Sequence, residues 1–319
     1  MRLEDIKKMT CYGAGTIGAG FAAYFALKGL EVNVFLRSED SIKRAEPKIQ
    51  EVIDSYLKYG ICDDGAKIWA NIKMTTDPKE AFEGVYFIQE NGAENVEQKH
   101  QMISVIEQYA PADAIIASSS SGMSVTLMAE GAQHPERILV AHPFNPAYLI
   151  PLIEICKGEK TSQEVVDLAV AFYKKYDKEP IVLQKEKLGF IANRLAHALW
   201  REEIALVCEG VCSMEDADKA VYYGPGLRWA IMGPAMGYEL GGGDLGLKGC
   251  AIKFGAMTNN TFEDISDMKK VPAEWADLSG EQIIPLMAHM PDHVGQTKAE
   301  IASFRDYMLI EILKMHHKL

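Results

Sequence analysis

Short apolar runs alternate with longer amphipathic stretches through the first half of the chain. Runs typical of buried strands cover residues 9–12, 32–36, 85–89, 114–118, 138–141, 152–156 and 181–183. Between them, apolar residues recur at helical spacing around 16–28, 40–59, 95–109 and 162–176. Buried strands that alternate with helices predict an α/β domain with a doubly wound, mainly parallel sheet covered on both faces.

The pattern changes near residue 188, because strand-like runs nearly vanish beyond it. Helical spacing covers 190–209, 214–222, 245–257 and 293–316. We therefore predict a sheet domain at residues 1–186, followed by an all-helical C-terminal domain at residues 187–319. A length of 319 residues suits two domains of this size.

Composition and charge restrict the partners of such a protein. Acidic residues outnumber basic residues by 45 to 33, and the net charge of −12 disfavours binding to nucleic acid. No apolar run reaches the roughly 20 residues that span a bilayer, and the N-terminal residues do not resemble a signal peptide. Since no apolar run could span a bilayer, we expect no membrane partner. The six cysteines show neither paired nor metal-ligand spacing, so we expect no metal site and a cytoplasmic location.

A glycine-rich turn follows the first apolar run. Residues Gly13-Ala14-Gly15-Thr16-Ile17-Gly18 form a G-x-G-x-x-G motif with a strand before it and a helix after it. Gly13 permits the tight bend, Gly15 leaves room for a pyrophosphate, and Gly18 lets the helix approach the strand. The helix N-terminus at Thr16 and Ile17 offers free N–H groups to phosphate oxygens. The motif predicts dinucleotide binding by a Rossmann-type domain; the alternative is a plain turn without a ligand.

The end of the second predicted strand bears on the choice of cofactor. Sites for NAD normally carry an acidic residue there, but Leu36 stands at this position. Arg37 can pair with a 2′-phosphate and Ser38 can donate a hydrogen bond, which favours NADP(H) over NAD(H) by a small margin. Alternatively, Arg37 is a surface residue and Ser38 caps the next helix, or Glu39 or Asp40 replaces the missing carboxylate.

A histidine and a glutamate suggest acid–base chemistry. His142 ends an apolar strand, and Glu154 lies in the next apolar run, where a carboxylate needs a partner. A neighbouring carboxylate fixes the tautomer of an imidazole and stabilises its protonated form, as proton removal from an alcohol requires. Alternatively, His142 merely ends a strand and Glu154 is exposed. Prolines at positions 143, 146 and 151 favour a rigid connection between the two residues.

Four segments together resemble the 3-hydroxyacyl-CoA dehydrogenase superfamily, in this order and spacing. They read GAGTIGAG, SSSSGMS, HPFNPAYLIPLIEI and GFIANRL, and the third is the most specific. The resemblance covers nearly the whole chain and implies an NAD(P)-dependent oxidoreductase acting on a CH–OH group. It also implies that the helical domain binds substrate and pairs two subunits into a homodimer.

The resemblance assigns roles residue by residue. It implies that His142 is the catalytic base, Glu154 its acidic partner, and Ser121 and Asn193 the residues that bind the substrate oxygen. It further implies cofactor contacts for Glu94 and Lys99, and places Asn145 near the nicotinamide ring.

The segment GPGLRWAIMGP at residues 224–234 departs from the acyl-CoA enzymes. It is similar to the branch that contains L-carnitine dehydrogenase and lambda-crystallin (L-gulonate 3-dehydrogenase), which implies a free hydroxy acid as substrate. Arg228 suits a carboxylate, since its planar guanidinium can bind both oxygens; a structural ion pair is the alternative. Trp229 can contact a quaternary ammonium group, although helix core is its more usual role.

Three hypotheses follow for the function. The first is hydride transfer between a nicotinamide cofactor and the C3 hydroxyl of a small 3-hydroxy acid, carnitine- or gulonate-like. The second is a short-chain 3-hydroxyacyl-CoA dehydrogenase, and the third is a catalytically silent dinucleotide-binding structural protein.

Overall fold

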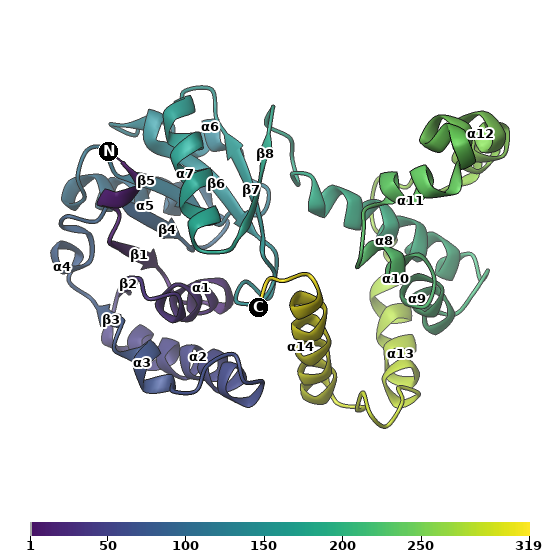
Figure 1. The fold of residues 1–319 in the computed structure, drawn as a ribbon, viewed down its shortest axis with the longest axis horizontal. Coiled ribbons are helices and arrows are strands. Elements are labelled where there is room, and N and C mark those ends of the chain that lie inside the picture. Colours follow the sequence, from purple (N-terminus) through teal and green to yellow (C-terminus); the bar gives the residue numbers. More distant parts are fainter. Residues whose placement is uncertain (1) are drawn as a thin grey trace. The chain divides into compact units, whose positions relative to one another are not determined.

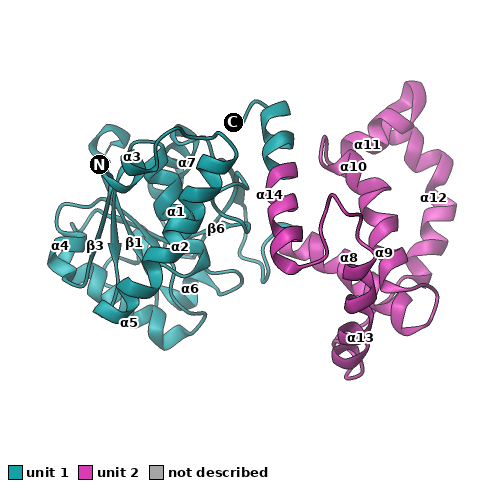
Figure 2. Ribbon diagram, turned by 90° about the horizontal axis from the view of Figure 1, so that it is seen from below, with its two compact units in different colours: residues 1–192, 309–319 teal, residues 193–308 magenta. Residues whose placement is uncertain are grey.

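The computed structural model describes residues 2–319, and the chain divides into two compact units (Figure 2). The first unit runs to Ala192 and also contains Leu309–Leu319, whereas the second is Asn193–Met308. The last residues group with the first unit because Ile310 and Leu313 are buried in its core. The domain limits given by the sequence pattern, 1–186 and 187–319, stay a prediction.

Eight strands of the described residues form one sheet in the first unit (Figure 1). They are β1 (Lys8–Tyr12), β2 (Glu31–Phe35), β3 (Ile72–Thr75), β4 (Phe87–Glu90), β5 (Ile115–Ser118), β6 (Ile138–Pro143), β7 (Leu152–Lys157) and β8 (Glu179–Leu183). Their order is β3-β2-β1-β4-β5-β6-β7-β8, and every neighbouring pair is parallel except β6 and β7. The predicted α/β class with a mainly parallel, Rossmann-type sheet is confirmed.

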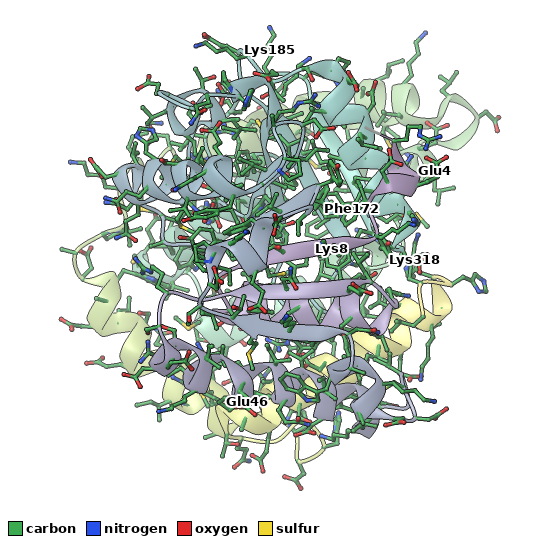
Figure 3. The ribbon with its side chains drawn as sticks, turned by 90° about the vertical axis from the view of Figure 1, so that its left-hand side faces the viewer. Glu4, Lys8, Glu46, Phe172, Lys185 and Lys318 are labelled. Carbon is green, nitrogen blue, oxygen red and sulfur yellow. The ribbon has the colours of Figure 1, made fainter. Side chains whose placement is uncertain are left out.

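Helices cover both faces of this sheet. They are α1 (Thr16–Leu27), α2 (Glu39–Lys58), α3 (Gly65–Trp69), α4 (Pro78–Phe82), α5 (Val96–Tyr109), α6 (Val125–Met128) and α7 (Gln163–Lys175). Successive strand residues point to opposite faces, so Ile115 belongs to one core cluster and Ile116 to the other. Phe172 is buried in this unit, stacked on Phe87, whereas Glu46 is exposed (Figure 3).

The second unit is built from helices. They are α8 (Ala192–Cys208), α9 (Met214–Tyr222), α10 (Pro225–Trp229), α11 (Pro234–Gly241), α12 (Gly246–Asp264), α13 (Trp275–Ala288) and α14 (Lys298–Met315), of which α14 continues into the first unit. Its core is small, with Ile204, Val207, Trp275 and Leu286 among the buried residues. Within residues 2–319, no helix has the length and apolar character needed to cross a bilayer.

Candidate active site

The three glycines of the turn between β1 and α1 have different structural roles. Gly13 has φ +92°, a region that favours glycine, and its N–H donates to the carbonyl of Phe35 over 2.9 Å. A Cβ on Gly18 would lie 2.0 Å from the oxygen of Gly13, so α1 can approach the turn only with glycine there. A Cβ on Gly15 would meet nothing within 4 Å, which leaves open space beside the turn.

This turn fits the pyrophosphate of a dinucleotide. Helix α1 begins at Thr16 with Gly15 as its N-cap, and no side chain caps it. The N–H groups of the first turn therefore face the open space beside Gly15, together with the positive end of the helix dipole. The turn lies at the carboxyl end of β1, where the strand order reverses between β1 and β4, the usual ligand position in such sheets.

The end of β2 lacks a carboxylate at the expected position. Leu36 is buried there, and its N–H donates to the carbonyl of Thr75. Ser38 is the N-cap of α2, and its hydroxyl accepts a hydrogen bond from the N–H of Ser41, as in the alternative that the sequence left open. Arg37 is exposed at the same edge.

Asn91 is a residue of this site that the sequence did not single out. It follows β4, and its Nδ2 donates to the carbonyls of Gln89 and Gly13, over 2.9 and 3.5 Å. Its Oδ1 accepts a hydrogen bond from the hydroxyl of Ser119 over 2.7 Å. Asn91 thus ties the glycine turn to the ends of β4 and β5; its position directly after a buried strand was the available signal.

Glu94 and Lys99 have protein partners in the structure. One Glu94 oxygen accepts a hydrogen bond from the N–H of Ser121, over 2.6 Å, and the other accepts one from the hydroxyl of Ser120. Lys99 is buried and donates to Glu90 over 2.6 Å. Glu94 therefore holds the segment that contains Ser121. The cofactor contacts of Glu94 and Lys99 stay predictions.

His142 and Glu154 lie directly opposite one another on the antiparallel strands β6 and β7. The imidazole Nδ1 lies 2.9 Å from the Glu154 Oε2 and donates to it, and the two residues are only 5% and 0% exposed. With its proton on Nδ1, the ring has Nε2 free to accept another. Their predicted pairing is therefore present in the fold, in a geometry suited to an acid–base group.

The second oxygen of Glu154 is also held by the protein. Oε1 accepts hydrogen bonds from the N–H groups of Ile191 and Ala192, over 2.8 and 2.9 Å, at the start of α8. Burial raises the pKa of the Glu154 carboxyl. The hydrogen bonds from His142, Ala192 and Ile191 act in the opposite direction and leave this pKa below its usual value. Glu154 is therefore ionised at neutral pH and can stabilise a protonated imidazole.

The lowered pKa of Glu154 predicts a pH dependence of stability. The ionised carboxylate stabilises the fold above the ordinary glutamate pKa, and this contribution is lost as the pH falls through the lowered pKa of the native state. Glu154→Gln should lower the free energy of unfolding at pH 7 by about 1–3 kcal/mol. The difference from wild type should shrink below about pH 4.5, as denaturant titrations would show. A difference independent of pH would contradict an ionised Glu154.

Aromatic residues border the imidazole. The rings of Phe190 and Phe144 have their centroids 5.4 and 6.3 Å from that of His142. Asn145, predicted to lie near the nicotinamide, is exposed in the loop between β6 and β7. The first unit thus places the glycine turn, the Ser121 segment and His142 at the carboxyl ends of β1, β5 and β6, with Glu154 opposite His142 on β7.

Three predicted substrate residues belong to the second unit. Asn193 lies in the first turn of α8, and Arg228 and Trp229 end α10. Arg228 and Trp229 line a cavity of about 310 Å³ together with Met232 and Tyr238. This cavity offers a guanidinium group beside aromatic rings, which suits a small organic anion.

Comparison with known proteins connects this site to one family. The profile described as 3-hydroxyacyl-CoA dehydrogenase, NAD binding domain, matches residues 8–187. The profile described as 3-hydroxyacyl-CoA dehydrogenase, C-terminal domain, matches residues 189–282.

Curated relatives and solved structures agree with these matches. The chain is 33% identical to an L-carnitine dehydrogenase of Bacillus cereus, over 100% of this chain and 95% of that protein. It is 36% identical to an L-carnitine dehydrogenase of Streptomyces griseus, over 98% and 90%. A solved structure of 5-formyl-3-hydroxy-2-methylpyridine 4-carboxylic acid 5-dehydrogenase, an NAD⁺-dependent dismutase, is 25% identical, with a TM-score of 0.79 over 98% of this chain and 97% of that one.

Proposed function

The chain belongs to the 3-hydroxyacyl-CoA dehydrogenase family, and from this premise we propose that it oxidises the C3 hydroxyl group of a small, free 3-hydroxy acid, carnitine- or gulonate-like. It is an NAD-dependent dehydrogenase acting on CH–OH. The observation that carries the proposal is the buried hydrogen bond between His142 and Glu154.

The residues of the first unit account for the proton chemistry. The glycine turn of Gly13, Gly15 and Gly18 would hold the dinucleotide, whose nicotinamide would supply a hydride acceptor for the carbinol carbon. His142 Nε2 removes the hydroxyl proton, because its Nδ1–H is held by Glu154 and cannot serve as the acceptor. The ionised Glu154 stabilises the imidazolium that forms. In the reverse direction, the same ring protonates the alkoxide. Ser121 and Asn193 are proposed to bind the reacting oxygen.

A free acid is favoured over a thioester by the second unit. Arg228 lines the cavity described above, and its guanidinium can bind a carboxylate through two parallel hydrogen bonds. A thioester carries no such anion near the reacting carbon. The curated relatives named L-carnitine dehydrogenase support the same substrate class.

NAD(H) is the cofactor that we propose. The matching profile describes NAD binding, and the structure with the TM-score of 0.79 is that of an NAD⁺-dependent enzyme. The small preference for NADP(H) that Leu36, Arg37 and Ser38 suggested has no support from these comparisons. Ser38 caps α2 by accepting a hydrogen bond from the N–H of Ser41.

A panel of substrates tests the proposal. L-carnitine, L-gulonate, 3-hydroxybutyrate and 3-hydroxybutyryl-CoA would each be offered with NAD⁺ and with NADP⁺, and the reduced nicotinamide measured by absorbance. We expect turnover of at least one free acid, with the higher kcat/KM for NAD⁺. Turnover of the thioester alone would support the acyl-CoA hypothesis, and no turnover of any substrate would support a structural protein.

The second unit is proposed to pair two copies of the chain. Helices α11 and α12 expose large apolar side chains, among them Leu240 (69%), Ile252 (69%) and Phe262 (67%). An apolar surface of this kind is typical of an interface rather than of a monomer surface. Light scattering of the wild type should give the mass of two chains, and Ile252→Asp with Phe262→Asp should give one. A monomeric wild type would contradict the homodimer.

A further inference from the structure

Lys178 is a buried lysine outside the site described so far. It lies between α7 and β8, its side chain is 2% exposed, and no carboxylate among residues 2–319 forms an ion pair with it. A buried charge costs free energy unless polar groups surround it. Methionine would fill a similar space without this cost, so packing alone does not explain a lysine here.

The Lys178 ammonium group binds the loop that joins β6 to β7. Its Nζ donates to the carbonyl of Ala147 over 2.6 Å and to that of Ile150 over 3.0 Å. These two hydrogen bonds span the loop, residues 144–151, which contains Asn145. The strands on either side of the loop carry His142 and Glu154.

The same ammonium group also contacts α1. Nζ lies 3.8 Å from the centroid of the Tyr24 ring, and the Tyr24 hydroxyl donates to the carbonyl of Tyr176 over 2.6 Å. The loop itself lies against this helix, since a Cβ on Gly20 would be 3.5 Å from the ring of Tyr148. Lys178 therefore joins the 144–151 loop to the helix whose N-terminus faces the dinucleotide site.

We propose that Lys178 is a positioning residue, which fixes the 144–151 loop against α1 and so holds Asn145, His142 and Glu154 in the arrangement that substrate oxidation requires. This inference rests on the proposed function, because it assigns the loop a part in that reaction. Lys178 itself touches neither His142 nor Glu154, so its effect is indirect.

The contacts of Lys178 do not require a permanent charge. Burial, together with the charge of Lys28, lowers the pKa of the Lys178 amine to about 7. The neutral amine carries two N–H groups and the ammonium three, so either form can donate to both carbonyl oxygens. Lys28 forms its own ion pair with Asp177 over 2.9 Å and does not bind the loop.

Lys178→Met tests the proposal, with Lys28→Met as the matched control. We expect Lys178→Met to lower kcat by about tenfold to a hundredfold through misplacement of the reacting groups. The KM for NAD⁺ should change less than about threefold, because the glycine turn is intact, and the primary deuterium isotope effect on kcat should rise. Hydrogen exchange should accelerate at residues 144–151 and remain unchanged in β1 and β4. Lys28→Met should change none of these quantities.

Two results would overturn the proposal. One is a kcat for Lys178→Met within twofold of the wild type. The other is faster exchange throughout the first unit without a change in the isotope effect, which would indicate a general loss of stability. If Lys178→Met does not fold, Lys178→Gln, which keeps two N–H donors, is measured in the same way. Hydrogen exchange does not depend on catalysis. If the wild type oxidised no hydroxy acid, the proposed function would be refuted, but exchange at residues 144–151 would still show whether Lys178 holds the loop.

Discussion

His142→Ala should lower kcat for oxidation of the hydroxy acid by about 10²–10⁴-fold, the usual contribution of a positioned general base. Without the imidazole, the hydroxyl proton has no acceptor when the hydride leaves. Steady-state kinetics would give kcat, and NADH fluorescence would give the dissociation constant of the cofactor, which should change little because the glycine turn lies on β1 and α1.

A second histidine provides the control for this substitution. His134 also lies beside a glutamate, with its Nδ1 3.4 Å from Glu136, but the pair is partly exposed and precedes β6 in the chain. His134→Ala should leave kcat within about twofold of the wild type, since a partly exposed pair contributes little. Equal activity of His142→Ala and the wild type would show that the assigned base is wrong.

Arg228→Met should lower kcat/KM for free hydroxy acids by about tenfold to a hundredfold, corresponding to roughly 1.5–3 kcal/mol for hydrogen bonds to a charged group. Methionine keeps much of the apolar stem of arginine, so the cavity that it shares with Trp229 and Tyr238 should keep its shape. Activity toward a thioester, which has no carboxylate to bind, should change less than threefold.

The control for Arg228 lies in the same unit. Arg305 pairs with the neighbouring Asp306 over 2.7 Å and does not line the cavity. Arg305→Met should leave kcat/KM for every substrate within about twofold, because Arg305 lies outside the cavity proposed to bind the carboxylate. If Arg228→Met kept the wild-type kcat/KM for the free acid, Arg228 would not bind the substrate carboxylate.

The sequence predicted the elements whose apolar pattern is strong and missed those whose pattern is weak. β3 was missed because it lies at the edge of the sheet, where Lys73 is exposed and the apolar run is interrupted. The helix α13 was missed because Gly280 and Pro285 interrupt its helical spacing. The helices α10 and α11 are short and begin at prolines, so their sequence pattern resembles that of a loop.

The same distinction applies to the site. The pairing of His142 with Glu154 could be predicted because an ionisable residue in an apolar strand needs a partner. The hydrogen bonds from the N–H groups of Ile191 and Ala192 to Glu154 could not be predicted. Almost every residue has a backbone N–H, so residue identity does not indicate which of them donate to a side chain. Nor could the contact of Lys178 with the 144–151 loop be predicted, since it depends on a turn that brings Lys178 to carbonyl groups about 30 positions earlier.

The position of Leu309–Leu319 has a consequence for how this protein is made. Ile310 and Leu313 complete the packing of a unit whose other residues leave the ribosome long before them, and Lys318 pairs with Glu179. The nucleotide-binding half therefore cannot complete this part of its core until residues 309–319 have left the ribosome. Until then a nascent chain exposes apolar surface that chaperones bind.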